Sequence, residues 1–235
     1  MRRYANIRIR QLSFSDNGYE LINSFLSSEQ LELFNSELGS VELPQSTGGI
    51  RNAQTKYHSI STYSSSSHVL EKAGVYLQGT PKFVRAILFN KTATNNWLVA
   101  WHQDRTVAVT NRFHADGWGP WSEKDGVLHV QPPLEVLNSM VTFRVHLDST
   151  SEENGCLSVV PQSHKLGILT QQEIAERSSG FTSVLCPAPE GSALVMRPHL
   201  LHASGKGSDP TQRRVLHLEY SDFTLPSGVS WAETV

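Results

Sequence analysis

Residues 83–110 read FVRAILFNKTATNNWLVAWHQDRTVAVT and contain three short runs of apolar, β-branched and aromatic residues. The runs are FVRAILFN (83–90), WLVAWH (97–102) and RTVAVT (105–110), with polar residues between them. Runs of about 4–8 such residues favour β-strands over helices. This stretch therefore predicts three consecutive strands.

The same pattern continues toward the end of the chain. Further strand-like runs are MVTFRVHL (140–147), CLSVV (156–160), SALVM (192–196) and RVLHLEY (214–220). Turn-forming segments such as HADGWGP, QPP, EENG, PAPEG and SGKGSDP separate them. Many short strands joined by polar turns predict a barrel or jelly roll, so we expect a mainly β (α+β) fold.

Helical patterns occur mainly before this strand-rich region, and one interrupts it. Residues 27–38 begin with a serine that has a glutamine three residues later, and residues 170–178 begin with a matching threonine and glutamate. Such pairs are typical of a capped helix start. Residues 68–79 predict another helix, ended by its last glycine. The turn-rich segments 43–54 and 59–67 are predicted to be loops.

Length and charge limit the classes of protein to consider. A chain of 235 residues is consistent with one domain (1–235), with a helical flank over about 1–80 and a jelly-roll core over about 81–222. The formal net charge of −2 and the pI of about 6.5 give no basic field for nucleic acid or an anionic membrane. We therefore expect a small-molecule partner, and the sequence leaves the oligomeric state open.

Cysteine content and the N-terminus indicate the compartment. Cys156 and Cys186 are too few for a disulfide framework and are predicted to be small core residues. The start, MRRYANIRIRQLSF, is basic but lacks the apolar core of a secretion signal. No apolar run approaches the length of a membrane span. A cytoplasmic protein is the expectation.

Two clusters of polar residues suggest chemistry. His102 and Asp104 point to the same side of an extended strand, which is consistent with either a structural pair or a metal site. A non-haem Fe(II) oxygenase needs two imidazoles and one carboxylate, and it leaves the remaining metal positions open. The segment RPHLLHASGKGSDPTQRRVLHLEY (197–220) offers His199 or His202 as the third ligand.

The same segment contains two adjacent arginines, the first of them eleven residues beyond His202. Arg213 could hold the far carboxylate of a dicarboxylate co-substrate by two parallel hydrogen bonds, because its guanidinium is a planar fork. Ser204 has the parity of His202 and could donate a further hydrogen bond. Arg214 is the rival and faces the opposite side of the strand. The pair could also be a solvated start of an edge strand.

Three segments resemble the phytanoyl-CoA dioxygenase family of Fe(II)/2-oxoglutarate oxygenases. They are AILFNKT…NNWLVAWHQD, HVQPPLEVLNSMVTFRVHLDSTSEENGCLSVVPQSHKLG and PHLLHASGKGSDPTQRRVLHLEYSD. The motifs H-x-D, E-N-G-x-L-x-V-x-P-x-S-H and H-x-S…R-R occur in the order of the family, and the resemblance covers residues 17–222. It implies a double-stranded β-helix, which is the jelly roll already predicted.

The resemblance also implies roles for individual residues. The implied Fe(II) ligands are His102, Asp104 and His202. The implied contacts to 2-oxoglutarate are Arg213, Ser204, Lys91 and Arg144. Halogenating relatives lack the carboxylate that Asp104 provides here, so the resemblance implies an O2-dependent hydroxylation with release of succinate and CO2. Gln162 stands where the family usually has glycine.

Two other hypotheses remain beside the hydroxylase. A cupin-like isomerase or dioxygenase would use a similar metal site without 2-oxoglutarate, and Arg213 would then be free. A metal-free binding protein is disfavoured by the intact His-x-Asp…His set.

The sequence does not name the substrate. The long segment 111–133 is predicted to contribute some of His114, Trp118, Trp121 and His129 to the substrate pocket. His146 and His217 lie in predicted strands and are expected to be buried, hydrogen-bonded core residues.

Overall fold

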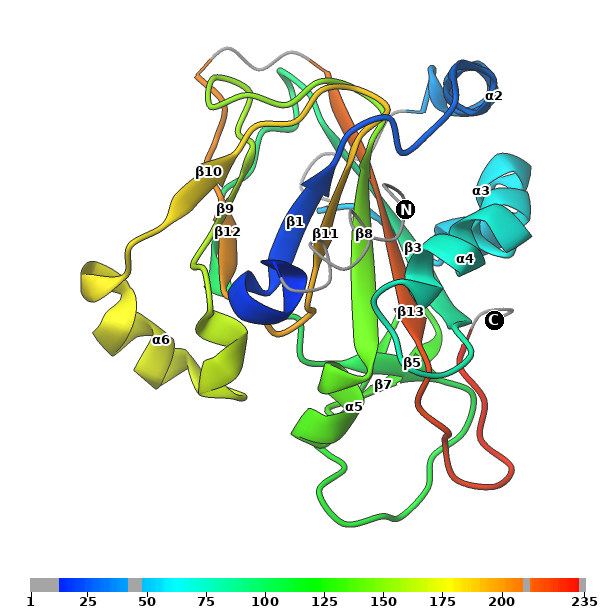
Figure 1. Cartoon of the computed structure of the whole chain (residues 1–235), viewed down its shortest axis with the longest axis vertical. Coiled ribbons are helices and arrows are strands. Elements are labelled where there is room, and N and C mark those ends of the chain that lie inside the picture. The colour runs from blue at the N-terminus through cyan, green and yellow to red at the C-terminus, as the bar shows by residue number, and fades with distance from the viewer. Residues whose placement is uncertain (1–12, 42–47, 209–211, 233–235) are drawn as a thin grey trace, which may run out of the picture.

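The computed structural model describes residues 13–41, 48–208 and 212–232, and within them the strands form three antiparallel sheets (Figure 1). The largest sheet has six strands in the order β1-β11-β8-β13-β3-β2. These are β1 (Tyr19–Ile22), β2 (Ile50–Arg51), β3 (Lys82–Lys91), β8 (Met140–His146), β11 (Ala193–Met196) and β13 (Arg213–Ser221).

A four-stranded sheet faces the larger one, in the order β10-β9-β12-β4 (Figure 1). It consists of β4 (Val99–His102), β9 (Leu157–Val159), β10 (Val184–Cys186) and β12 (His202–Ser204). A small sheet of β5 (Val107–Val109), β7 (Val127–Val130) and β6 (Trp121–Lys124) packs at one end. The predicted mainly β jelly roll is confirmed.

Helices lie outside the sheets. Residues 13–17 are helical, and the further helices are α2 (Ser28–Leu38), α3 (His58–Ser64), α4 (Ser67–Gly74), α5 (Leu134–Asn138) and α6 (Gln171–Arg177), with 3-10 turns at η1 (Ala53–Thr55), η2 (Ser163–Leu166) and η3 (Ser178–Gly180). Figure 1 shows α3 and α4 on the side of the large sheet that faces away from the four-stranded sheet. Among the described residues, no helix is long and apolar enough to cross a membrane.

Two predicted helices are confirmed and two other predictions need correction. α2 and α6 both begin with the reciprocal capping box expected from the sequence. The helix predicted over 68–79 ends earlier, at Gly74. The loop predicted over 59–67 is wrong, because α3 occupies most of it. Its serine-rich sequence is a weak helix former, but Ile60 and Tyr63 are buried in the core, and such packing overrides propensity.

Alternation along β13 explains why the chemistry lies inside the jelly roll. Leu216, Leu218 and Tyr220 point toward the helices and join the main apolar core. Arg213 and His217 have the opposite parity and line a hollow between the sheets. The large sheet therefore presents an apolar face to its helices and a polar face to the interior.

The segment 111–133 is not one irregular loop. β6 and β7 form a hairpin in which Lys124 pairs with Val127 across the two-residue turn Asp125–Gly126. Both turn residues have positive φ, 52° and 78°. Two left-handed residues make the tight turn that matches the twist of paired strands, and Asp-Gly is well suited to it.

Candidate functional site

His102, Asp104 and His202 come together between the two facing sheets. β12 pairs with β4 so that His202 lies directly opposite His102. Asp104 follows β4, and its carboxylate oxygens lie 3.7 Å from His102 Nε2 and 3.6 Å from His202 Nε2. One ligand atom from each of the three residues lies within 4.8 Å of the other two. The three residues predicted as metal ligands are thus brought together, in a geometry that suits a single metal ion.

Both imidazoles are held in the orientation that a metal ligand needs. His102 Nδ1 lies 2.8 Å from the carbonyl oxygen of Ala100, and His202 Nδ1 lies 2.8 Å from that of Leu200. A proton on each Nδ1 would be donated to these carbonyls, which leaves both Nε2 lone pairs facing Asp104. Backbone acceptors of this kind fix the tautomer and ring orientation of metal-binding histidines.

The electrostatics favour an ionised Asp104 beside a neutral His202. Burial alone would raise the pKa of Asp104, but the neighbouring His202, His102, His217 and Arg85 hold that pKa below its ordinary value. Burial and the adjacent His102 lower the pKa of His202 to about 3. An ionised carboxylate and a neutral imidazole are the forms of these side chains that bind a divalent cation.

A small hollow of about 100 Å³ is lined by this cluster and by all four predicted co-substrate residues. Lys91 Nζ donates to Ser204 Oγ at 2.9 Å and to the Gly205 carbonyl at 2.8 Å. Arg213 donates to the carbonyl of Gly155 at 2.6 Å. Arg144 lies 3.3 Å from a ring nitrogen of His217. The hollow is therefore lined by three cationic side chains.

These cations have no carboxylate partner among the described residues. Nε of Arg144 and Nε of Arg213 are buried without a hydrogen-bond acceptor. Burial, followed by repulsion from Arg213 and Arg144, lowers the pKa of Lys91 to about 7. Burial likewise lowers the pKa of each arginine to about 10. Buried cations with unpaired donors need an anion, so the hollow suits a small dicarboxylate.

Arg214 lies on the opposite face of β13, as the alternation predicted. It donates to both carboxylate oxygens of Asp148 at 2.8 and 2.6 Å, and to Asn35 at 2.9 Å. The alternative of a solvated arginine pair is wrong, because Arg213 and Arg214 are 3% and 6% exposed.

His217 is buried and hydrogen-bonded, as predicted, but its place in the lining of the hollow was not foreseen from the sequence. It lines the hollow, and its Nε2 lies 3.1 Å from Glu219 and 3.9 Å from Asp104. Glu219 in turn forms a buried bidentate ion pair with Arg85, with both contacts at 2.8 Å. The signal was its parity: His217 lies four residues after Arg213 and so shares its face. Extending the alternation of β13 from Arg213 would therefore have placed His217 in the hollow.

Two further histidines, His146 and His199, lie outside the His-Asp-His cluster. His146 is buried as expected, but neither ring nitrogen has a hydrogen-bond partner, so the prediction of a hydrogen-bonded core residue was wrong. Burial and the nearby Arg144 and Arg213 lower its pKa to about 3. His199, the rival third ligand, lies outside the cluster and packs against His164 with ring centroids 6.1 Å apart.

A wider chamber of about 550 Å³ adjoins the small hollow and is also lined by His102 and Asp104. The two spaces also share Ile87, Phe89, Trp97 and Val99, so they adjoin along this wall. We call the two spaces the inner hollow and the outer chamber.

The residues proposed from segment 111–133 do not line the outer chamber. Trp118 and Trp121 pack against Phe113, His129 is buried, and His114 is exposed. Lys124 from the same segment does line it.

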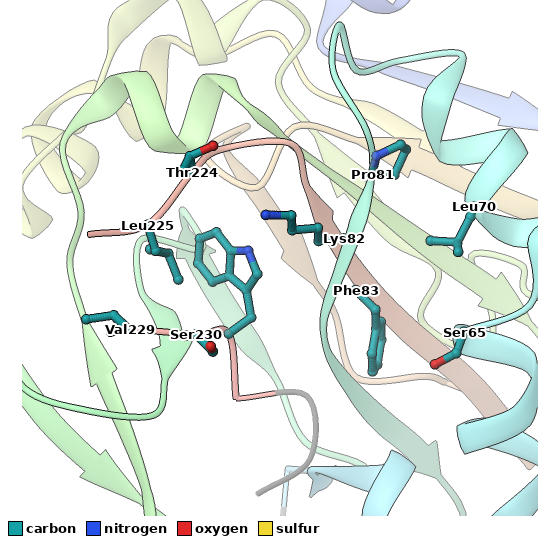
Figure 2. Close-up of a pocket in the computed structure, with 10 residues that line it drawn as sticks. Ser65, Leu70, Pro81, Lys82, Phe83, Thr224, Leu225, Val229 and Ser230 are labelled. Carbon is teal, nitrogen blue, oxygen red and sulfur yellow. The ribbon is translucent and has the colours of Figure 1, made fainter. Parts of the chain in front are cut away.

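A separate groove of about 350 Å³ lies between α4, the start of β3 and the C-terminal segment. Figure 2 shows Leu70 and Leu225 on opposite sides of this groove. It shares no lining residue with the inner hollow or the outer chamber.

A jelly roll with two histidines and one carboxylate on its inner face is typical of non-haem iron oxygenases. The family model for phytanoyl-CoA dioxygenase matches residues 14–215. The chain therefore belongs to the phytanoyl-CoA dioxygenase family, whose members are oxygenases of the Fe(II)/2-oxoglutarate type, and the resemblance seen in the sequence is confirmed.

Similar proteins support this placement. The chain is 23% identical over 224 residues to the methylphosphonate hydroxylase of Gimesia maris, covering 85% of this chain and 82% of that protein. It shares its fold with the epimerase SnoN, solved with Fe3+, alpha ketoglutarate and nogalamycin RO (TM-score 0.71, 14% identity, 97% of this chain and 86% of that one). EctD from S. alaskensis, solved with 2-oxoglutarate and 5-hydroxyectoine, has a TM-score of 0.66 at 15% identity, covering 91% and 75% of the two chains.

Proposed function

We propose that the protein is an Fe(II)- and 2-oxoglutarate-dependent hydroxylase of a small-molecule metabolite. The observation that carries this proposal is the position of a His-Asp-His cluster beside a buried, cationic hollow. Family membership supports the class of reaction, and the relative that is named a methylphosphonate hydroxylase supports hydroxylation as its outcome.

Fe(II) would be held by His102, Asp104 and His202. Two imidazoles and one carboxylate match the preference of iron and leave other metal positions free for small ligands. The carbonyls of Ala100 and Leu200 keep both rings directed at the cluster.

2-Oxoglutarate would bind in the inner hollow. Arg213 would bind a carboxylate through its unpaired donor, assisted by Lys91 and the hydroxyl of Ser204. Arg144 would supply the third positive charge. These residues replace the water that a dianion loses on burial, which is why a cationic lining is required.

When bound, iron and 2-oxoglutarate supply the activation of O2, which is coupled to conversion of 2-oxoglutarate into succinate and CO2. The chain contributes orientation and exclusion of water. Phe89, Trp97 and Leu157 provide an apolar wall to the hollow, and such a wall limits solvent access to a reactive centre.

Anaerobic titration tests the proposal. Addition of Fe(II) and 2-oxoglutarate should produce a weak visible charge-transfer band, and aerobic turnover with substrate should place one oxygen atom from ¹⁸O2 in the product. A cupin-like enzyme without this co-substrate would bind iron but give no band. That result would overturn the proposal, and a product lacking ¹⁸O would exclude hydroxylation.

A further inference from the structure

The outer chamber has an unusual balance of charge for a pocket beside a metal site. Its lining contains three cationic side chains, those of Arg51, Arg85 and Lys124. Asp104 is the one carboxylate among the lining residues, and a bound metal would neutralise it. The remaining wall is mostly apolar and includes Trp97 and Trp101.

Two of the three cations already have partners. Arg85 forms the buried bidentate ion pair with Glu219. Arg51 lies 3.3 Å from Asp125, and both side chains are about half exposed, at 44% and 53%. The side chain of Lys124 forms no ion pair or hydrogen bond with any residue that the structure describes. Its ammonium group is therefore the unpaired positive charge in the lining of the chamber.

Lys124 is also partly withdrawn from water. Burial, followed by repulsion from Arg85 and Arg51, lowers its pKa, while Asp104 and Glu219 oppose that shift. An ammonium group that loses hydration without gaining a partner costs free energy, and an anion in the chamber would remove that cost.

The fold places Lys124 over the chamber by two identifiable devices. The Asp125–Gly126 turn ends β6 directly after Lys124. The ion pair between Asp125 and Arg51 ties this turn to β2, where Arg51 lies opposite Ile87, another lining residue. These contacts hold the tip of the β6–β7 hairpin beside β3, which lines the chamber next to His102 and Asp104.

We propose that the outer chamber binds a small organic anion, and that Lys124 is the principal contact to its carboxylate, phosphonate or phosphate group. Arg51 at the rim is the second contact. The carbon skeleton lies against the aromatic wall, toward His102 and Asp104. The binding of the anion is independent of the proposed hydroxylase function. Its identification as the substrate rests on that function. The cluster then has one set of cations for the co-substrate and a separate set for the substrate.

Equilibrium binding tests this inference without turnover. Protein loaded with redox-inert Zn²⁺ and saturating 2-oxoglutarate would be titrated calorimetrically with methylphosphonate, butyrate and the neutral analogue butyramide. Lys124→Met should weaken binding of the better anion by roughly ten- to a hundredfold, as expected for loss of a charge-assisted hydrogen bond. Lys124→Arg should retain most of the affinity. Affinity for butyramide should not change.

The matched control is Lys165→Met, which removes the same charge from η2, where Lys165 pairs with Asp16. It should bind anions as the wild type does, and thermal unfolding should show that both methionine variants are folded. Equal anion affinity in wild type and Lys124→Met would overturn the inference, as would wild-type protein that binds neither anion more tightly than butyramide. The anaerobic band of Fe(II) with 2-oxoglutarate should persist in Lys124→Met. Its absence from the wild type would instead count against the proposed function.

Discussion

His202 lies directly opposite His102 in the antiparallel pairing of β12 with β4, and their ring centroids are 4.2 Å apart. Residues 100 positions apart in the sequence thus become neighbours through strand register. A one-residue shift of β12 would turn His202 away and bring its neighbours to the opposite face. The metal site therefore depends on the register of this one strand pair.

Removal of any of the three cluster residues should strongly weaken metal binding. His102→Ala, Asp104→Ala and His202→Ala should each weaken Fe(II) affinity by more than about a hundredfold. Loss of a residue that only hydrogen-bonds a metal ligand already lowers metal affinity by about 10–100-fold. His199→Ala is the control and should retain iron. Anaerobic metal titration measures all four variants. Loss of metal from His199→Ala with retention by His202→Ala would show that the third ligand is misassigned.

Arg213→Ala should selectively weaken 2-oxoglutarate binding. Leaving a buried carboxylate without its partner costs about 2–5 kcal/mol, which is roughly a thirty- to several-thousand-fold rise in the dissociation constant. Arg213→Lys should recover only part, since an ammonium cannot make two parallel hydrogen bonds. Titration by the charge-transfer band gives these constants. Iron affinity should barely change.

Arg214→Ala is the register control for this experiment. Because Arg214 pairs with Asp148, its loss should lower the stability of the protein and leave co-substrate affinity close to that of the wild type. If Arg214→Ala, and not Arg213→Ala, loses 2-oxoglutarate, the assignment of the two faces of β13 is incorrect.

The central part of this site could be predicted from the sequence because short-range rules determine it. Period-two alternation separated Arg213 from Arg214, and the H-x-D spacing placed two metal-binding side chains on one side. The choice of His202 over His199 needed the family pattern, since a strand's parity cannot be assigned until its first residue is known.

Other features depended on contacts that no local pattern reveals. Lys124 lies at the outer chamber because its hairpin reaches a distant strand, where the turn residue Asp125 pairs with Arg51, 74 positions away in the sequence. The Asp-Gly turn signal itself was visible in EKDGVLHV and would have predicted the hairpin. α3 was missed because its burial, and not its serine-rich sequence, stabilises it.

Affinity for 2-oxoglutarate should fall above neutral pH. Burial and the two neighbouring arginines lower the pKa of Lys91 to about 7, so the empty site loses this charge as pH rises through 7. A bound dianion favours the charged form, and binding must then take up a proton. The dissociation constant should rise by up to about tenfold per pH unit above 7. Calorimetry between pH 7 and 9, in buffers of different ionisation enthalpy, measures both the affinity and the proton uptake.

Lys91→Met is the matched variant for this pH dependence. It should bind 2-oxoglutarate more weakly than the wild type at pH 7 and show a flat profile up to pH 9. A wild-type profile that is equally flat would mean that Lys91 keeps one protonation state throughout.

Gln162→Gly should stabilise the protein. Gln162 precedes η2 with φ 65° and ψ −1°, a left-handed conformation that costs a residue with a Cβ about 1–2 kcal/mol and that glycine adopts freely. The side chain is exposed, so little packing is lost. After the entropy cost of glycine, the free energy of unfolding should rise by about 1 kcal/mol, which corresponds to roughly 2–4 °C in Tm. Gln162→Ala keeps the strained backbone and should change little. An unchanged or lower Tm in the glycine variant would mean that other contacts of this turn offset the strain.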